Sequence, residues 1–122
     1  MQEEHTMKKY LAVYTGSAAA MAEWNSMHKH ELQERQAAGI KAWHAWVEKN
    51  KASIIETGAP LGRTKCISSA GVTDIRNNLM AFTIVQADSH EAAAQLFENH
   101  PHFTVFPGET VEVMACLPIP AM

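Results

Sequence analysis

The strongest candidate for a catalytic side chain in this sequence is a histidine in a predicted helix. Ile40, Trp43, His44 and Val47 recur at helical spacing, which predicts that they share the inner face of a helix over about residues 40–50. An imidazole titrates near neutral pH, so His44 among aromatic groups is a candidate general acid or base. The structural alternative is a core histidine that is hydrogen-bonded to the backbone.

Other motifs that carry chemistry are absent from the sequence or poorly spaced. His28 and His30 stand two residues apart on a predicted helix, where their side chains diverge. His100 and His102 could share an ion in an extended segment, but no cysteine or carboxylate stands at a ligand spacing near them, and we predict no metal site. The sequence has no phosphate-binding glycine loop or nucleotide fingerprint, so we predict no cofactor. Cys66 has no base beside it, which argues against a cysteine nucleophile.

The elements that must position these residues can be read from the sequence pattern. Runs rich in β-formers predict strands at about residues 9–15, 52–57, 79–85 and 110–117. Ser17 can cap a helix that ends or bends at Gly39, and Pro101 ends a later helix. Residues 59–78 form a long excursion, with a short strand near residues 65–69.

The order of these elements is the ferredoxin-like, split βαβ pattern, which predicts an α+β fold with an antiparallel sheet. Helices in such a unit cover one sheet face. The last strand is nevertheless apolar on both sides, since Val111 and Val113 alternate with Met114 and Cys116. We therefore predict a homodimer in which a second copy covers the other face. Trp46, which points away from the predicted inner stripe of its helix, fits an interface.

Length and composition are typical of one globular domain. The chain has 122 residues, is 47% hydrophobic and 19% charged, and carries a net charge of -3. The near-neutral charge balance argues against a basic nucleic-acid-binding surface. The sequence has no apolar run long enough to span a membrane, and its polar N-terminus lacks the order of a signal peptide. Together with two unpaired cysteines, this predicts a cytoplasmic protein with no membrane partner. We expect residues 1–7 to form a tail and residues 8–122 a single domain.

Short motifs from about residue 8 to residue 117 resemble those of a known family. They lie at residues 8–14, 43–47, 57–62, 82–92, 100–102 and 111–114. The most specific are a Gly-x-Pro-Leu turn, an Ala-Asp-Ser-x-Glu-Ala helix start and a His-Pro segment. In this order they resemble the YCII-related family of the dimeric α+β barrel superfamily. The resemblance implies a ferredoxin-like protomer that pairs with its twin into a barrel, and a cleft between sheet and helices.

The resemblance also implies site residues. In one branch of the family a helix histidine, at the position of His44, pairs with an aspartate before a proline, and that position here is His100. His100 would then hold the tautomer of His44, whereas His102 is better explained by an interaction with the helix end. The substrate contacts of the implied cleft are Trp43, Phe82, Phe103 and Arg63. Asp74 and Arg76 could meet a polar ligand or simply belong to a solvated loop.

Three classes of function remain open at this stage. The resemblance implies a cofactor-free small-molecule enzyme with lyase-like or isomerase-like acid–base chemistry, in which His44 and His100 are the catalytic pair. A non-catalytic homodimer that binds a small ligand or regulates another process is the alternative on the same fold. A cofactor-independent oxygenase is a third class, for which Trp24, Asn25 and His44 supply suitable residue types.

Overall fold

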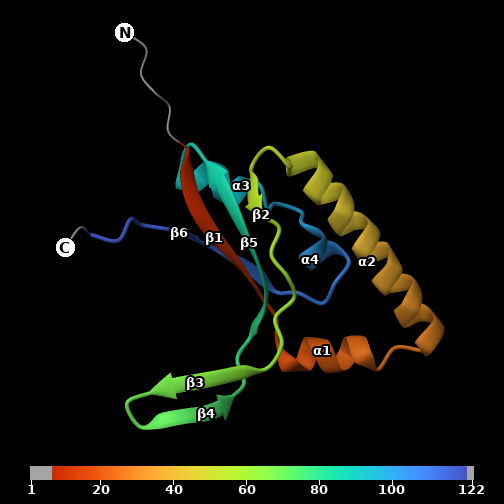
Figure 1. Ribbon diagram of the computed structural model, residues 1–122. Helices are drawn as coiled ribbons and strands as arrows, with labels where there is room; N and C mark the ends of the chain where they lie inside the picture. Colours follow the sequence, from red (N-terminus) through yellow and green to blue (C-terminus); the bar gives the residue numbers. More distant parts are fainter. Residues whose placement is uncertain (1–6, 121–122) are drawn as a thin grey trace.

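The computed structural model describes residues 7–120, which form a sheet, four helices and a separate hairpin (Figure 1). The strands are β1 (Lys8–Thr15), β2 (Ile54–Glu56), β3 (Thr64–Ser68), β4 (Gly71–Ile75), β5 (Leu79–Ala87) and β6 (Thr110–Ala115). The helices are α1 (Ala18–Asn25), α2 (Lys29–Asn50), α3 (His90–Gln95) and α4 (Pro101–Thr104). Most of the predicted tail, residues 1–6, lies outside the described residues. No helix in the described part of the chain is long and apolar enough to cross a membrane.

Four strands form one antiparallel sheet in the order β2-β5-β1-β6. Tyr10 in the central strand β1 lies opposite Val85 in β5 and opposite Ala115 in β6. Because β1 and β2 are both antiparallel to β5, they run in the same direction, as a crossover through α2 requires. The α+β class and the antiparallel sheet are confirmed, and the strand order is the one expected of the split βαβ pattern.

The helices lie on one side of the sheet, where the core forms. Tyr10, Ala12 and Tyr14 of β1 pack there with Trp46 of α2 and Phe97 beyond α3. Figure 1 shows α2 and α4 on this side, to the right of the sheet. The alternate side chains of each strand point to the opposite side. This uncovered sheet face comprises Leu11, Val13, Ile55, Phe82, Ile84 and Met114, which are half-buried or exposed.

The predicted break of the first helix at Gly39 is wrong. The helix ends at Ser26, whose backbone N–H donates to carbonyl oxygens of α1, and α2 begins after His28. The Nδ1 atom of His28 accepts the backbone N–H of His30 at 3.3 Å. α2 then continues through Gly39. A Cβ at Gly39 would lie 2.4 Å from the ring of Phe106, so this glycine permits close packing and does not end the helix.

The inner face of α2 is rotated from the predicted one. Trp46, predicted to be exposed at an interface, is 8% exposed, and its Nε1–H donates to the carbonyl oxygen of Leu96 at 2.9 Å. Ile40 and His44, predicted to face inward, are exposed. Gly39 and Trp46 stand two helical turns apart and both pack inward, and this turns Ile40 and His44 outward.

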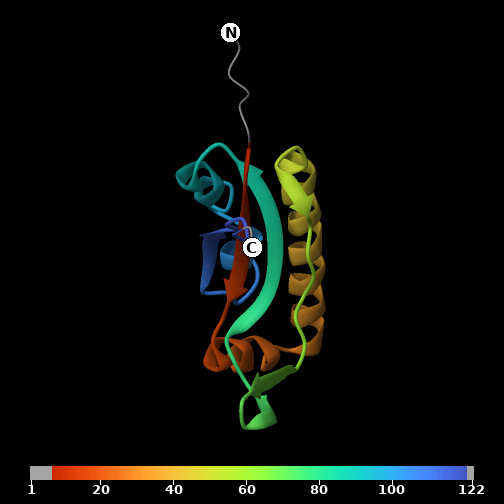
Figure 2. The same cartoon turned by 60° about the vertical axis from the view of Figure 1, so that its left-hand side comes forward.

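The long excursion of residues 59–78 contains a hairpin of its own. β3 and β4 pair only with each other among the described strands, and Figures 1 and 2 show them extending beyond the end of the main sheet. Cross-strand partners Ile67 and Val72 are 72% and 63% exposed. The predicted short strand at residues 65–69 is thus half of a projecting hairpin.

Candidate functional site

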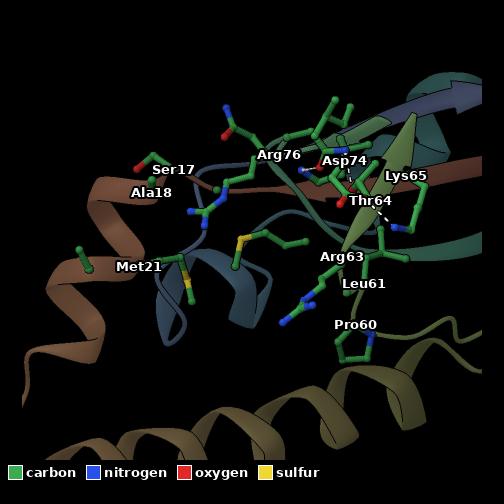
Figure 3. Close-up of a pocket in the computed structure, with 18 of the residues that line it drawn as sticks. Ser17, Ala18, Met21, Pro60, Leu61, Arg63, Thr64, Lys65, Asp74 and Arg76 are labelled. Atoms are coloured by element: carbon green, nitrogen blue, oxygen red, sulfur yellow. Dashed lines mark hydrogen bonds and ion pairs between the residues drawn. The ribbon is translucent and has the colours of Figure 1, made fainter. Parts of the chain in front are cut away.

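A cleft opens between α1 and the β3–β4 hairpin, beside the start of β5 (Figure 3). Its volume is about 1230 Å³, and it is lined by residues 16–18, 21, 22, 25, 60–65 and 74–80. Small-molecule sites typically occupy roughly 300–1,000 Å³. The cleft can therefore accept a small organic molecule together with water.

Local hydrogen bonds fix the α1 side of the cleft. The Oγ atom of Ser17 accepts the N–H of Ala20 at 3.0 Å and caps α1, as predicted from the sequence. The N–H of Gly16 donates to the carbonyl oxygen of Asn78 at 3.0 Å, which ties the start of α1 to the segment before β5. A Cβ at Gly16 would lie 2.2 Å from the Sδ atom of Met80. Glycine at this position therefore lets the Met80 thioether lie against the backbone at the cleft.

Four charged side chains lie on the hairpin side of the cleft. The Nζ atom of Lys65 and the Oδ1 atom of Asp74 form an ion pair at 2.6 Å. Arg63 and Arg76 have no hydrogen-bonding or ion-pair partner among the described residues. In Figure 3 both guanidinium groups point from the hairpin into the space between it and α1. The lining therefore carries two cations that no carboxylate of the described residues compensates.

A second group of titratable residues is buried in the core beneath the sheet. His100 is fully buried among Tyr14, Trp43, Trp46 and Phe97, with ring-centroid distances from 4.5 to 5.9 Å. We call these four rings the aromatic cage. Burial, with a smaller contribution from neighbouring His102, lowers the pKa of His100 to about 4. The imidazole is therefore neutral near pH 7.

Hydrogen bonds define which nitrogen of His100 carries the proton. Its Nδ1 atom accepts the backbone N–H of His102 at 3.0 Å, so the neutral ring is protonated at Nε2. This Nε2 atom is buried and has no hydrogen-bond partner within the described part of the chain. The Nε2 atom of His102 lies 2.7 Å from the carbonyl oxygen of Thr15, and burial lowers the pKa of His102. His102 thus holds β1 from within the core.

The hydroxyl of Tyr14 completes this buried group. It lies 2.7 Å from the Oγ1 atom of Thr83, which in turn donates to the carbonyl oxygen of Thr57 at 3.0 Å. The Tyr14 hydroxyl is therefore the donor to Thr83. Burial raises the pKa of Tyr14 to about 12, so the phenol stays protonated. No three His, Cys, Asp or Glu side chains in the described chain gather closely enough to hold a metal ion.

The two predicted catalytic histidines lie in different environments. His44 is exposed on α2, whereas His100 is fully buried. No hydrogen bond or ring contact joins them within the described residues, and neither lines the cleft. Trp43 does contact His100, at a ring-centroid distance of 4.8 Å.

The other predicted substrate contacts are dispersed over the molecule. Arg63 lines the cleft. Phe82 lies on the uncovered sheet face, because its neighbour Thr83 points into the core. Phe103 is 40% exposed and lines a separate, smaller cavity of about 430 Å³ beside Trp24. Arg76, expected either to meet a polar ligand or to belong to a solvated loop, lies in the cleft.

Comparisons with known proteins find structural similarity at low sequence identity. No family model matches the sequence, and no curated protein matches it. The fold is similar to that of the 5-chloro-2-hydroxyhydroquinone dehydrochlorinase of Burkholderia phenoliruptrix AC1100, solved in complex with 2,5-dihydroxybenzoquinone. The TM-score is 0.49 at 19% sequence identity, over 86% of this chain and 89% of that chain. Membership of the YCII-related family stays a prediction from the sequence motifs.

Proposed function

We propose that the protein binds a small organic molecule in the cleft between α1 and the hairpin. The observation that carries this proposal is the cleft itself, which combines apolar and charged lining residues from three separate segments. Met21 and Met80 lie in it, and thioether side chains adapt to ligands of different shape. Small-molecule sites characteristically combine such apolar surface with a few polar groups.

The methionine methyl groups provide a direct test of binding. Ligands that enter the cleft are expected to shift the [13C]methyl NMR signals of Met21 and Met80, but not that of Met114 on the uncovered sheet face. Ala22→Phe, which places a ring in the cleft, is expected to weaken binding at least about tenfold, since a ring there excludes the ligand. Ala19→Phe on the same helix lies outside the cleft and serves as the control. Equal affinities of the two variants would place the ligand elsewhere.

We further propose that the functional unit is a homodimer formed through the uncovered sheet face. Leu11, Val13, Phe82 and Ile84 form a contiguous apolar patch across the paired strands β1 and β5. Exposed apolar patches of this kind are typical of protein interfaces. A twofold axis through the patch would place the same surface on both chains.

A single charge on this face tests the dimer. The wild-type protein is expected to have about twice the chain mass of 13.5 kDa by light scattering, whereas Ile84→Lys is expected to be a monomer. Ile40→Lys, at a 55% exposed position on α2, is the matched control and is expected to remain dimeric. Circular dichroism establishes that both variants keep their fold. A monodisperse wild-type monomer would refute the dimer.

The acid–base enzyme predicted from the sequence is the second candidate. The observation that favours it is the partnerless, protonated Nε2 atom of His100, a buried donor that no group in the described chain uses. A reacting group would have to enter the aromatic cage to reach it. Conversion of a bound compound into a product distinguishes this candidate from simple binding, in which the compound is recovered unchanged.

A further inference from the structure

We infer that the ligand of the cleft carries a carboxylate or phosphate group that is bound between Arg63 and Arg76. This inference rests on the proposed small-molecule binding and specifies its chemistry. It follows from the charge of the cleft, from the placement of the two arginines on the hairpin, and from their lack of partners among the described residues.

The charge of the cleft is opposite to that of the chain. The protein carries a net charge of -3, yet three cationic side chains line the cleft against one carboxylate. Lys65 and Asp74 compensate each other through their ion pair. The remaining positive charge therefore belongs to Arg63 and Arg76, and it attracts an anion from solution.

The two arginines occupy equivalent positions at the base of the hairpin. Arg63 immediately precedes Thr64, Arg76 immediately follows Ile75, and Thr64 and Ile75 are cross-strand partners. The register thus brings two like charges to the same end of a two-stranded sheet. Like charges at neighbouring positions repel each other, and an anion between them removes this repulsion.

The base of the hairpin is held in place by Asn77. Its Nδ2 atom donates to the Oγ1 atom of Thr64 at 3.1 Å, and its Oδ1 atom accepts the N–H of Leu79 at 3.0 Å. These two bonds connect β3, the turn after β4 and the start of β5. While the hairpin is ordered, these bonds fix the positions of the two arginine backbones relative to β5, which lowers the entropic cost of binding to the ordered hairpin.

Guanidinium groups select the kind of anion. Each presents a planar fork of N–H donors that matches the oxygens of a carboxylate or phosphate. Met21 and Met80 provide apolar surface on the other side of the cleft, as Figure 3 shows for Met21. A ligand with an apolar body and one such anionic group matches both the methionines and the arginines of the lining.

Three phenyl compounds test the inference through the methionine methyl signals. Benzoate and phenyl phosphate are expected to bind at least about tenfold more tightly than the neutral benzyl alcohol. Arg63→Gln and Arg76→Gln are each expected to weaken anion binding by about ten- to a hundredfold, whereas the alcohol is unaffected. Lys41→Gln removes an exposed cation of α2 outside the cleft and is the matched control, with a change of less than about threefold. Arg63→Lys and Arg76→Lys, which keep the charge, are expected to retain part of the preference.

Each outcome decides one question. If benzoate or phenyl phosphate binds and loses affinity in the arginine variants, the inference holds, and the better of the two identifies the anionic group. If benzyl alcohol binds as tightly as both anions, or if the glutamine variants bind the anions normally, the inference is overturned while small-molecule binding stands. If none of the three compounds shifts Met21 or Met80, both the inference and the proposed function fail.

Discussion

Replacing Gly58 by alanine is expected to destabilise the protein by more than about 3 kcal/mol, a large fraction of the stability of a domain of this size. Gly58 has φ +80°, a conformation that residues with a side chain rarely adopt. A Cβ there would lie 1.6 Å from the carbonyl oxygen of Phe82, a backbone atom of the central sheet that cannot move aside. Urea denaturation of the variant measures the loss.

The control for this substitution is Gly62→Ala, only four residues further along the same segment. No atom lies within 4 Å of a Cβ at Gly62, so the change is expected to alter stability by less than about 0.5 kcal/mol. Similar stabilities for the two variants would contradict the close approach of this segment to β5. The comparison also bears on the cleft, because residues 60–65, which line it, begin two residues after Gly58.

The second large effect is a loss of stability in acid that depends on His100. Its pKa is about 4 in the folded protein and near 6.5 when unfolded. Well above pH 6.5 the ring is neutral in both states and contributes no pH dependence. As the pH falls from 6.5 to 4, the unfolded chain binds a proton that the folded chain excludes. The free energy of unfolding is then expected to fall by about 1.4 kcal/mol per pH unit, or about 3 kcal/mol in total.

His100→Asn isolates this contribution. Asparagine can accept the N–H of His102 as the histidine does, since both act as helix N-caps, but it does not titrate. The variant is expected to be less stable at pH 7 and to show a flatter decline between pH 6.5 and 4. Urea denaturation at several pH values measures both, and identical slopes for His100→Asn and the wild type would refute the assignment. The lowered pKa of His102 acts in the same direction and accounts for a residual slope.

Much of the fold could be predicted because β-strands leave a strong signal in this sequence. The four strands of the sheet, their antiparallel arrangement and the Ser17 cap follow from local patterns. The inner face of α2 could not be predicted in this way, because two overlapping sets of residues both recur at helical spacing. Ile40 and His44 belong to one set, and Gly39 and Trp46 to the other. Glycine is a helix breaker by propensity, so its use as a packing position is visible only once Phe106 is in place.

The candidate site was harder to predict than the fold, since it depends on the register of a hairpin. Arg63 and Arg76 are thirteen residues apart, and nothing local marks them as a pair. They become neighbours because Thr64 lies opposite Ile75. For His100, the sequence identifies the residue as chemically notable. It does not show that the side chain is fully buried within the aromatic cage.

The separate pairing of the hairpin has a consequence for the energetics of the cleft. A two-stranded sheet is marginally stable by itself, whereas the four-stranded sheet shares the core with the helices. The free energy of local unfolding is therefore expected to be low for the hairpin, which can open while the core stays folded. A ligand that contacts both Arg63 and α1 binds only molecules in which the hairpin is ordered, so its apparent Kd is the intrinsic Kd divided by the fraction of such molecules. Ligand binding and the order of the hairpin are in this way two readouts of one equilibrium.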